Sequence, residues 1–181
     1  PVPGYLDLRQ ALSKKFKEDN NLDYTPEQIV VSNGAKQSIA NVMLALLDPG
    51  DEVIVFTPYW VSYTALIQLA EGTPVFAEGS IENDFKATAD QGKAAITDKT
   101  KAIIFSSPCN PTGSVFTEEE LSEIAKVLEE HKDIIVISDE IYEMINFGGK
   151  HVSIGTFPGM LERTVTVNGF SKGFAMTGWR V

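Results

Sequence analysis

Lys172 is the side chain with the most distinctive potential chemistry, because a lysine amine beside a cationic ring is a nucleophile that condenses with aldehydes. It follows the apolar run 164–167 and the flexible pair Asn168-Gly169. Taken alone, a lysine at such a position is usually a surface residue. Its chemical role therefore depends on what the other polar segments of the chain bring to it.

Asp139 follows the apolar run 134–137 and offers a carboxylate at the end of a predicted strand. A half-buried carboxylate requires a cationic partner, and a protonated ring nitrogen would serve. Such a pair interacts by about 5 kcal/mol before desolvation, at ~3 Å and an effective dielectric constant of ~20. The alternative is that Asp139 caps a helix that begins at Glu140. In that helix Tyr142 lies on the same face, so its hydroxyl could reach the same ligand.

Gly34-Ala35-Lys36 stands between a predicted strand and a predicted helix. The unpaired N–H groups and partial positive charge of a helix N-terminus suit a phosphate, although a plain tight turn explains the segment equally well. Two further phosphate donors, Ser171 and Arg180, come near the end of the chain, and an arginine can bind phosphate through a bidentate fork.

Two more segments could contact a ring-shaped ligand. Asn110 opens a rigid turn in a loop with two X-Pro bonds, either of which can be cis, and its amide could bind a phenolic oxygen. Trp60 could stack its flat face on the ring. A structural turn and ordinary core packing are the alternatives. Each segment therefore has a structural explanation by itself, but together they meet the needs of one planar, anionic aldehyde cofactor.

The hydrophobic pattern predicts a scaffold that would gather these side chains. Helical spacing alternates with short β-branched runs, which is typical of an α/β fold with a mostly parallel sheet sandwiched by helices. The predicted strands are six: 29–31, 52–56, 73–77, 101–105, 134–137 and 164–167. Helices are predicted after Gly4, from Gly34, at 59–70, at 89–96 and after the capping box Thr117–Glu120. Ligands of open parallel sheets bind beyond the carboxyl ends of the strands, where the candidate side chains stand.

Composition narrows the function. With 181 residues, 43% hydrophobic and 22% charged, the chain suits one globular domain or a large part of one. The net charge of −10 argues against a nucleic-acid partner. The single cysteine, Cys109, excludes an internal disulfide and a cysteine-based zinc cluster, and it favours a reducing, cytoplasmic compartment. No apolar run approaches the roughly 20 residues of a membrane span. We expect no membrane partner and no bound metal.

The motifs together resemble the class I/II aminotransferases that depend on pyridoxal 5'-phosphate (PLP). The resemblance runs along almost the whole chain and is carried by the segments SSPCNPTG (106–113), SDEIY (138–142) and SKGFAMTGWR (171–180). The segments DPGDEV (48–53) and PYWVSY (58–63) resemble the bacterial aspartate aminotransferase subgroup.

The resemblance implies a role for each candidate residue. Lys172 would hold PLP as a Schiff base and shuttle the substrate proton, and Asp139 would bind the pyridine nitrogen. Asn110 and Tyr142 would bind the phenolic oxygen. Trp60 would stack on the ring and contact the substrate, which Asn110 would also contact. The phosphate would be bound by Gly34, by the backbone of Ala35 and Lys36, and by Arg180. Ser171 is a weaker candidate for the phosphate. The reaction implied is ping-pong transfer of an amino group between an amino acid, aspartate first, and 2-oxoglutarate.

The resemblance also implies that the chain is a fragment. Residues 1–181 would be part of the PLP-binding large domain, truncated at both ends, without the N-terminal segment and the C-terminal small domain. An antiparallel strand expected from about Val181 and the substrate-binding arginine would be missing, so the fragment alone should be inactive. The resemblance implies a homodimer. Two alternatives stay open: another PLP enzyme of the same fold (a β-carbon lyase or aminocyclopropane-carboxylate synthase type), or a non-catalytic PLP-fold domain of a regulator.

Overall fold

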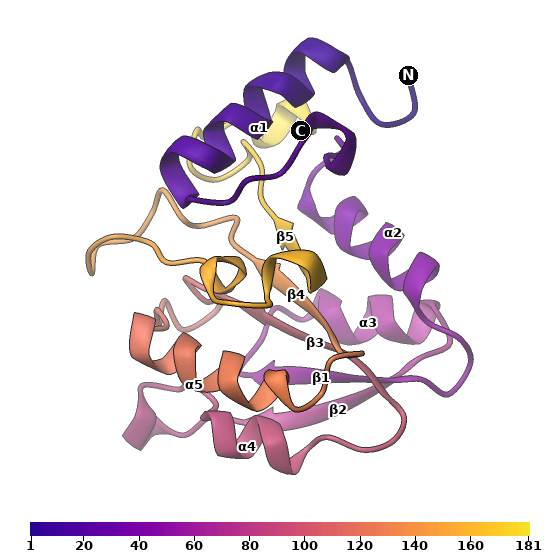
Figure 1. Cartoon of the computed structure of the whole chain (residues 1–181), viewed down its shortest axis with the longest axis vertical. Coiled ribbons are helices and arrows are strands. Elements are labelled where there is room, and N and C mark those ends of the chain that lie inside the picture. Colours follow the sequence, from indigo (N-terminus) through magenta and orange to yellow (C-terminus); the bar gives the residue numbers. More distant parts are fainter.

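A parallel sheet forms the centre of the molecule. The computed structural model describes all 181 residues and contains five strands in the order β2-β1-β3-β4-β5, with every neighbouring pair parallel. The strands are β1 (Glu52–Thr57), β2 (Thr73–Glu78), β3 (Thr100–Ser106), β4 (Ile135–Asp139) and β5 (Thr164–Val167). This is the α/β architecture that the sequence predicts (Figure 1).

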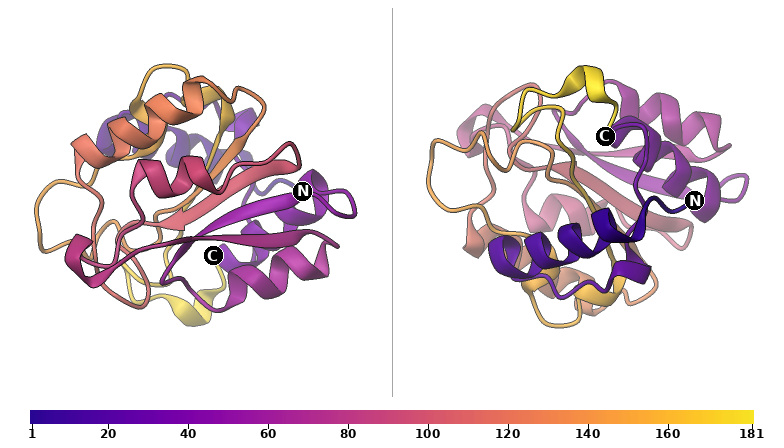
Figure 2. Two further views of the ribbon diagram at one scale, coloured as in Figure 1. Left: turned by 90° about the horizontal axis from the view of Figure 1, so that it is seen from below. Right: turned by 90° about the horizontal axis from the view of Figure 1, so that it is seen from above.

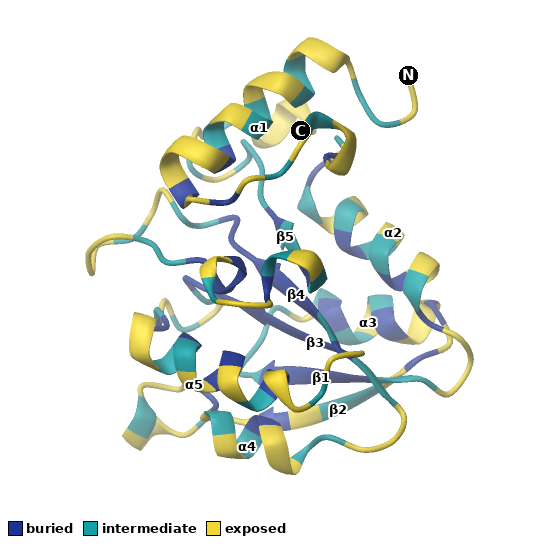
Figure 3. Ribbon diagram, viewed as in Figure 1, coloured by how far each residue is buried: buried dark blue, intermediate teal, exposed yellow.

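Helices cover both faces of the sheet (Figure 2). Helices α2 (Ala35–Leu46) and α3 (Ser62–Leu69) pack on one face, and α4 (Ala89–Ala94) and α5 (Glu118–Glu129) pack on the other. The alternation of side chains along β1 explains why both faces are covered. Val53 and Val55 join the core under α2 and α3, while Ile54 and Phe56 join the core under α4 and α5. A strand buried on both faces reads as a continuous apolar run, and the central strands are the buried layer of the molecule (Figure 3).

Helix α5 follows the predicted pattern closely. The Thr117 hydroxyl accepts a hydrogen bond from the Glu120 N–H, and the Glu120 carboxylate accepts one from the Thr117 N–H. This reciprocal pair satisfies two backbone donors at the start of the helix. Four apolar residues at helical spacing are buried against the sheet: Leu121, Ile124, Ala125 and Leu128.

The prediction of a strand at 29–31 is wrong. Ile29 has an extended backbone, but the segment has no strand beside it, and the Val31 N–H donates instead to the Pro3 carbonyl. A strand requires a neighbour to complete its hydrogen bonds. A groove of about 530 Å³ lies beside the segment, lined by Ile29 and Val31 and, across from them, by Val165 and Thr166 of β5.

Two predicted helices differ in extent, and one that the sequence offered as an alternative is absent. Helix α3 begins at Ser62 rather than at residue 59, after the cis Thr57–Pro58 bond, and α4 ends at Ala94. No helix follows Asp139. Its carboxylate accepts the Ile141 N–H, and the segment then continues as two tight turns closed by Glu143 N–H to Glu140 O and Ile145 N–H to Tyr142 O. The Asp139 side chain therefore makes the hydrogen bond of a helix cap, but no helix follows it.

The first helix, α1 (Leu6–Asn20), connects to the segment that follows β4. Its Phe16 packs with Leu22 and Ile29, and Lys15 forms an ion pair with Glu143. Asn20 also donates to Glu143, at 2.5 Å. These contacts hold α1 beside the chain that leaves the end of β4.

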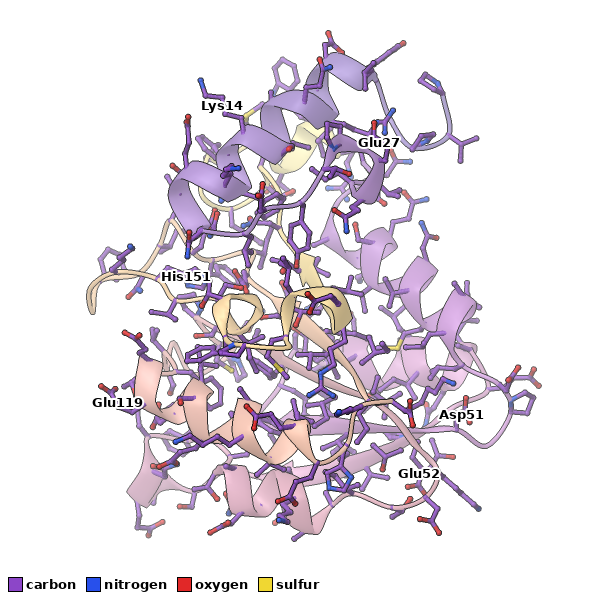
Figure 4. All side chains as sticks on the ribbon, viewed as in Figure 1. Lys14, Glu27, Asp51, Glu52, Glu119 and His151 are labelled. Carbon is purple, nitrogen blue, oxygen red and sulfur yellow. The ribbon has the colours of Figure 1, made fainter.

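The periphery of the molecule is charged. Lys14, Glu27 and Glu119 are exposed and point outward (Figure 4). No helix combines the length and the apolar character that crossing a bilayer requires.

Candidate active site

The carboxyl ends of the parallel strands bring several of the predicted site residues to one edge of the sheet. In the strand register Ser106 pairs with Asp139, and Asp139 pairs with Val167. Lys172 follows β5 after a short connection, so it and Asp139 leave neighbouring strands at the same edge. This is the edge at which open parallel sheets bind ligands.

Asp139 is a buried carboxylate without an ion pair. Its side chain is 4% exposed, and it accepts the Tyr63 hydroxyl at 2.6 Å and the Ile141 N–H at 3.3 Å. Burial raises the pKa of Asp139 to about 6, with a smaller upward effect from Glu140, while the two hydrogen bonds oppose the rise. A buried carboxylate that lacks a cation is suited to a ligand that supplies one.

Lys172 lies beside Tyr142, with its ammonium 5.9 Å from the centre of the tyrosine ring. Tyr142 and Asn110 line one open depression of about 980 Å³, together with the loop from Pro108 to Thr117. Both X-Pro bonds of this loop, at Pro108 and Pro111, are cis. The structure therefore places the amide, the phenol and the amine on neighbouring loops of the same edge.

Gly34 and Arg180 form a pocket suited to an anion at the start of α2. Gly34 is the N-cap of α2, with φ of 84° and no side-chain cap, so the N–H groups of Ala35 and Lys36 have no acceptor within the helix. The Arg180 guanidinium lies at the same place, donating to the Asn33 carbonyl at 3.0 Å and to the Thr177 carbonyl at 2.7 Å. Free backbone donors beside a guanidinium suit a phosphate.

Trp60 connects the anion pocket to Asp139. Its ring lies edge-on to Tyr63, at 5.7 Å between ring centres, and Tyr63 in turn contacts Asp139. The Lys36 ammonium lies 5.0 Å from the centre of the Trp60 ring. The sequence had suggested a role only for the Lys36 backbone, so this side-chain position adds a cation to the site.

Ser171 is the candidate that the structure connects least. Its carbonyl accepts the Thr177 hydroxyl at 2.9 Å, which helps to close the turn before Arg180. Its own hydroxyl makes no hydrogen bond. Ser171 therefore contributes to the site through its backbone carbonyl and not through its side chain.

Two of the six buried side-chain atoms that lack a hydrogen-bond partner lie at the same edge. They are the Ser106 hydroxyl and the Asn168 amide nitrogen. Because buried polar groups are almost always paired, either atom could bond to a ligand held at this edge. Neither residue, nor Tyr63, was expected from the sequence.

A second buried network closes the loop beside the site. The Glu140 carboxylate accepts the Ser138 hydroxyl at 2.8 Å, the Ser153 hydroxyl at 2.6 Å and contacts the His151 ring at 2.7 Å. Glu140, Glu143 and His151 come close enough together to surround a cation. The carboxylate oxygens of both glutamates are already used by side-chain donors, however, so we interpret the cluster as structural.

Comparison with known proteins agrees with the fold and with the motifs. The aminotransferase class I and II family matches residues 1–181. The chain is 51% identical to an aspartate aminotransferase of Bacillus subtilis over 183 residues and 50% identical to a bifunctional aspartate and glutamate/aspartate-prephenate aminotransferase of Petunia hybrida over 182 residues. The chain belongs to the class I and II aminotransferase family, as the motif resemblance predicts.

Solved structures show the same fold. Aspartate aminotransferase from Thermus thermophilus with maleate superposes with a TM-score of 0.95 at 46% identity, covering 99% of this chain and 46% of that one. An aromatic aminotransferase from Pyrococcus horikoshii gives 0.95 at 47% identity, covering 99% of this chain and 48% of that one. The chain spans 46% of the Bacillus relative and 38% of the Petunia relative, which is less than half of either.

Proposed function

We propose that the full-length protein is a PLP-dependent aminotransferase that moves an amino group between aspartate and 2-oxoglutarate. The observation that carries the proposal is the buried carboxylate of Asp139, which has no cationic partner and lies on the strand next to the one that leads to Lys172. A cationic ring nitrogen and an aldehyde are the two groups that such a pair would bind.

The residues of the site fit PLP in three respects. Asp139 would take the ring nitrogen, because its two partners, the Tyr63 hydroxyl and the Ile141 N–H, are both neutral. The Gly34 and Arg180 pocket would take the phosphate, with backbone donors from Ala35 and Lys36. Asn110 and Tyr142 would take the phenolic oxygen, and Trp60 would cover the ring.

When bound, PLP supplies an electron sink for the carbon that loses its proton. Lys172 then has two tasks in the proposal: its amine holds the cofactor, and once released it accepts the proton from the substrate carbon and returns it at a second position as general base and then acid. Asp139 would hold a proton on the ring nitrogen. Two substrates that use the same site in turn give ping-pong kinetics.

The assignment to aspartate is supported by the names of the Bacillus and Thermus relatives. A second support is the Lys36 ammonium over Trp60, because a cation beside the residue proposed to contact the substrate suits an amino acid with an extra carboxylate. The Pyrococcus relative is named for aromatic substrates, so an aromatic amino acid is the competing substrate class. A β-carbon lyase of the same fold is the competing reaction.

Residues 1–181 are proposed to be part of the PLP-binding large domain of a longer protein. The homodimer remains a prediction from the resemblance, and the cytoplasmic location remains a prediction from the cysteine content.

The proposal is tested by adding PLP to the full-length protein and recording its absorbance. We expect a band that disappears in Lys172→Ala, while Lys14→Ala, an exposed lysine on α1, keeps it. The wild-type protein is then given aspartate with 2-oxoglutarate, and oxaloacetate is measured. A band that persists in Lys172→Ala would overturn the cofactor assignment. A different keto acid in place of oxaloacetate would overturn the aspartate assignment, and cleavage products in place of any keto-acid pair would favour the lyase.

A further inference from the structure

Tyr63 is a fully buried tyrosine whose hydroxyl reaches the strand edge. It lies on α3, is 0% exposed, and packs in the core that α2 and α3 form with the sheet. Its hydroxyl donates to the Oδ2 atom of Asp139 at 2.6 Å, across 76 positions of sequence. A buried phenol requires a partner, and this one has a carboxylate.

The Tyr63 phenol is the one side chain that donates a hydrogen bond to Asp139. The other donor is the Ile141 N–H, which reaches Oδ1 at the longer distance of 3.3 Å. The charge nearest to Asp139 along the chain is Glu140, whose effect on the carboxylate is repulsive. The orientation of the carboxylate therefore depends mainly on the phenol, and each oxygen keeps a lone pair for a further donor.

Tyr63 is itself held in place by other rings. Trp60 lies edge-on to it at 5.7 Å, and Tyr59 stacks on it at 6.5 Å between ring centres. Burial, together with the negative charge of Asp139, raises the pKa of Tyr63 well above its usual value. The phenol therefore stays protonated, and remains a donor, across the working pH range.

We propose that Tyr63 is a positioning residue, whose phenol holds the Asp139 carboxylate in the orientation that receives the ring nitrogen of the cofactor. The inference rests on the proposed function for the identity of the ligand. It adds a residue to the site that acts through Asp139 rather than by touching the cofactor.

The test compares Tyr63→Phe with wild type in the full-length protein. Phenylalanine fills the same space and removes only the hydroxyl, so the core should persist, which circular dichroism checks. The carboxyl carbon resonance of Asp139, assigned by its loss in Asp139→Asn, is followed against pH without cofactor. Because the phenol opposes the upward shift, we expect the titration midpoint to rise above its value of about 6. The Kd for PLP should increase about tenfold, the scale of a lost hydrogen bond to a charged group.

Two further variants separate positioning from packing. Tyr59→Phe changes a neighbouring, half-buried tyrosine and should leave the midpoint and the Kd unchanged. Tyr63→His keeps a ring N–H that can donate to the same oxygen, so it should recover part of the lost affinity. A Tyr63→Phe protein with an unchanged midpoint and an unchanged Kd would overturn the proposal, as would equal losses in Tyr63→Phe, Tyr63→His and Tyr59→Phe. If wild type shows no Lys172-dependent PLP band at all, the proposed function fails instead, and the midpoint of Asp139 still reports whether the phenol controls the carboxylate.

Discussion

The Arg180 guanidinium occupies the space into which any side chain at Gly34 would project. A Cβ added to Gly34 would lie 2.7 Å from Nη2 of Arg180, and the residue has φ of +84°. The two residues are 146 positions apart in the sequence, and each restricts the other. The proposed phosphate pocket therefore depends on the lack of a Cβ atom at Gly34 as much as on the charge of Arg180.

Gly34→Ala should weaken PLP binding through this contact. The Cβ must displace the guanidinium, and the positive φ adds backbone strain of about 1 kcal/mol. We expect lower affinity for PLP, with a smaller change for pyridoxal, which has no phosphate. Both are measured by equilibrium titration of the full-length protein.

Gly50→Ala is the matched control, because Gly50 has φ of +91° with nothing within 4 Å of an added Cβ. It should cost similar stability and leave PLP affinity intact. Equal affinity losses for PLP and pyridoxal in Gly34→Ala would contradict the role of the pocket.

The stability of the cofactor-free protein should depend on the ionisation of Asp139. Its pKa is raised from 3.8 to about 6 in the folded state, mainly by burial, so folding favours the protonated form. The stabilising effect is complete below about pH 4 and is lost as the pH rises to about 6, by up to about 3 kcal/mol. Asp139→Asn should remove this dependence and make the cofactor-free protein more stable than wild type at pH 7.

Urea unfolding at a series of pH values measures this effect. The same Asp139→Asn variant should bind PLP far more weakly, so stability and binding change in opposite directions. A variant that loses stability at pH 7 would show that burial of the charge is already compensated within the protein.

Lys36→Met should reduce kcat/KM for aspartate about tenfold, because it removes the cation that lies over Trp60. The value for an aromatic amino acid should change little. Steady-state kinetics with both substrates measure the ratio. Lys14→Met, which removes an exposed cation on α1, should leave the ratio as it is, and a parallel loss for both substrates in Lys36→Met would argue for a packing role.

Glu140→Gln should destabilise the protein by about 2 kcal/mol. All three contacts of the buried carboxylate are with Ser138, His151 and Ser153, and an amide would turn an N–H₂ group toward one of these donors. The midpoint of urea unfolding measures the loss. The exposed Glu119→Gln is the control and should stay close to wild type, whereas equal midpoints for the two variants would refute the network as a stabilising element.

Much of the fold was predictable, because both faces of the sheet are covered. Five strands and the stripe of α5 follow directly from apolar runs and from helical spacing. The segment 29–31 has the same composition as a strand, but its pairing depends on a neighbour that local sequence does not specify. Composition predicts the tendency to be extended and cannot predict the partner.

The site was predictable to the extent that its residues follow strand ends. Asp139, Lys172 and Asn110 stand out because polar groups after apolar runs require an explanation. Tyr63 does not stand out, because a tyrosine on an apolar helix is typical of the core. Only the packing of α3 against the sheet, mainly at β1 and β2, brings its hydroxyl to Asp139. The Lys36 ammonium over Trp60 depends on a side-chain rotamer in the same way.

The contacts of Glu140 with His151 and Ser153 tie together the two ends of the segment 141–152. The tip of that segment is exposed, with Phe147 97% accessible, and takes no part in these contacts. The strand that bears Asp139 is thereby anchored independently of the tip. Because Phe147 also lines the depression that contains Asn110 and Tyr142, a change of length or sequence at the tip would reshape one wall of that depression while leaving the strand in place.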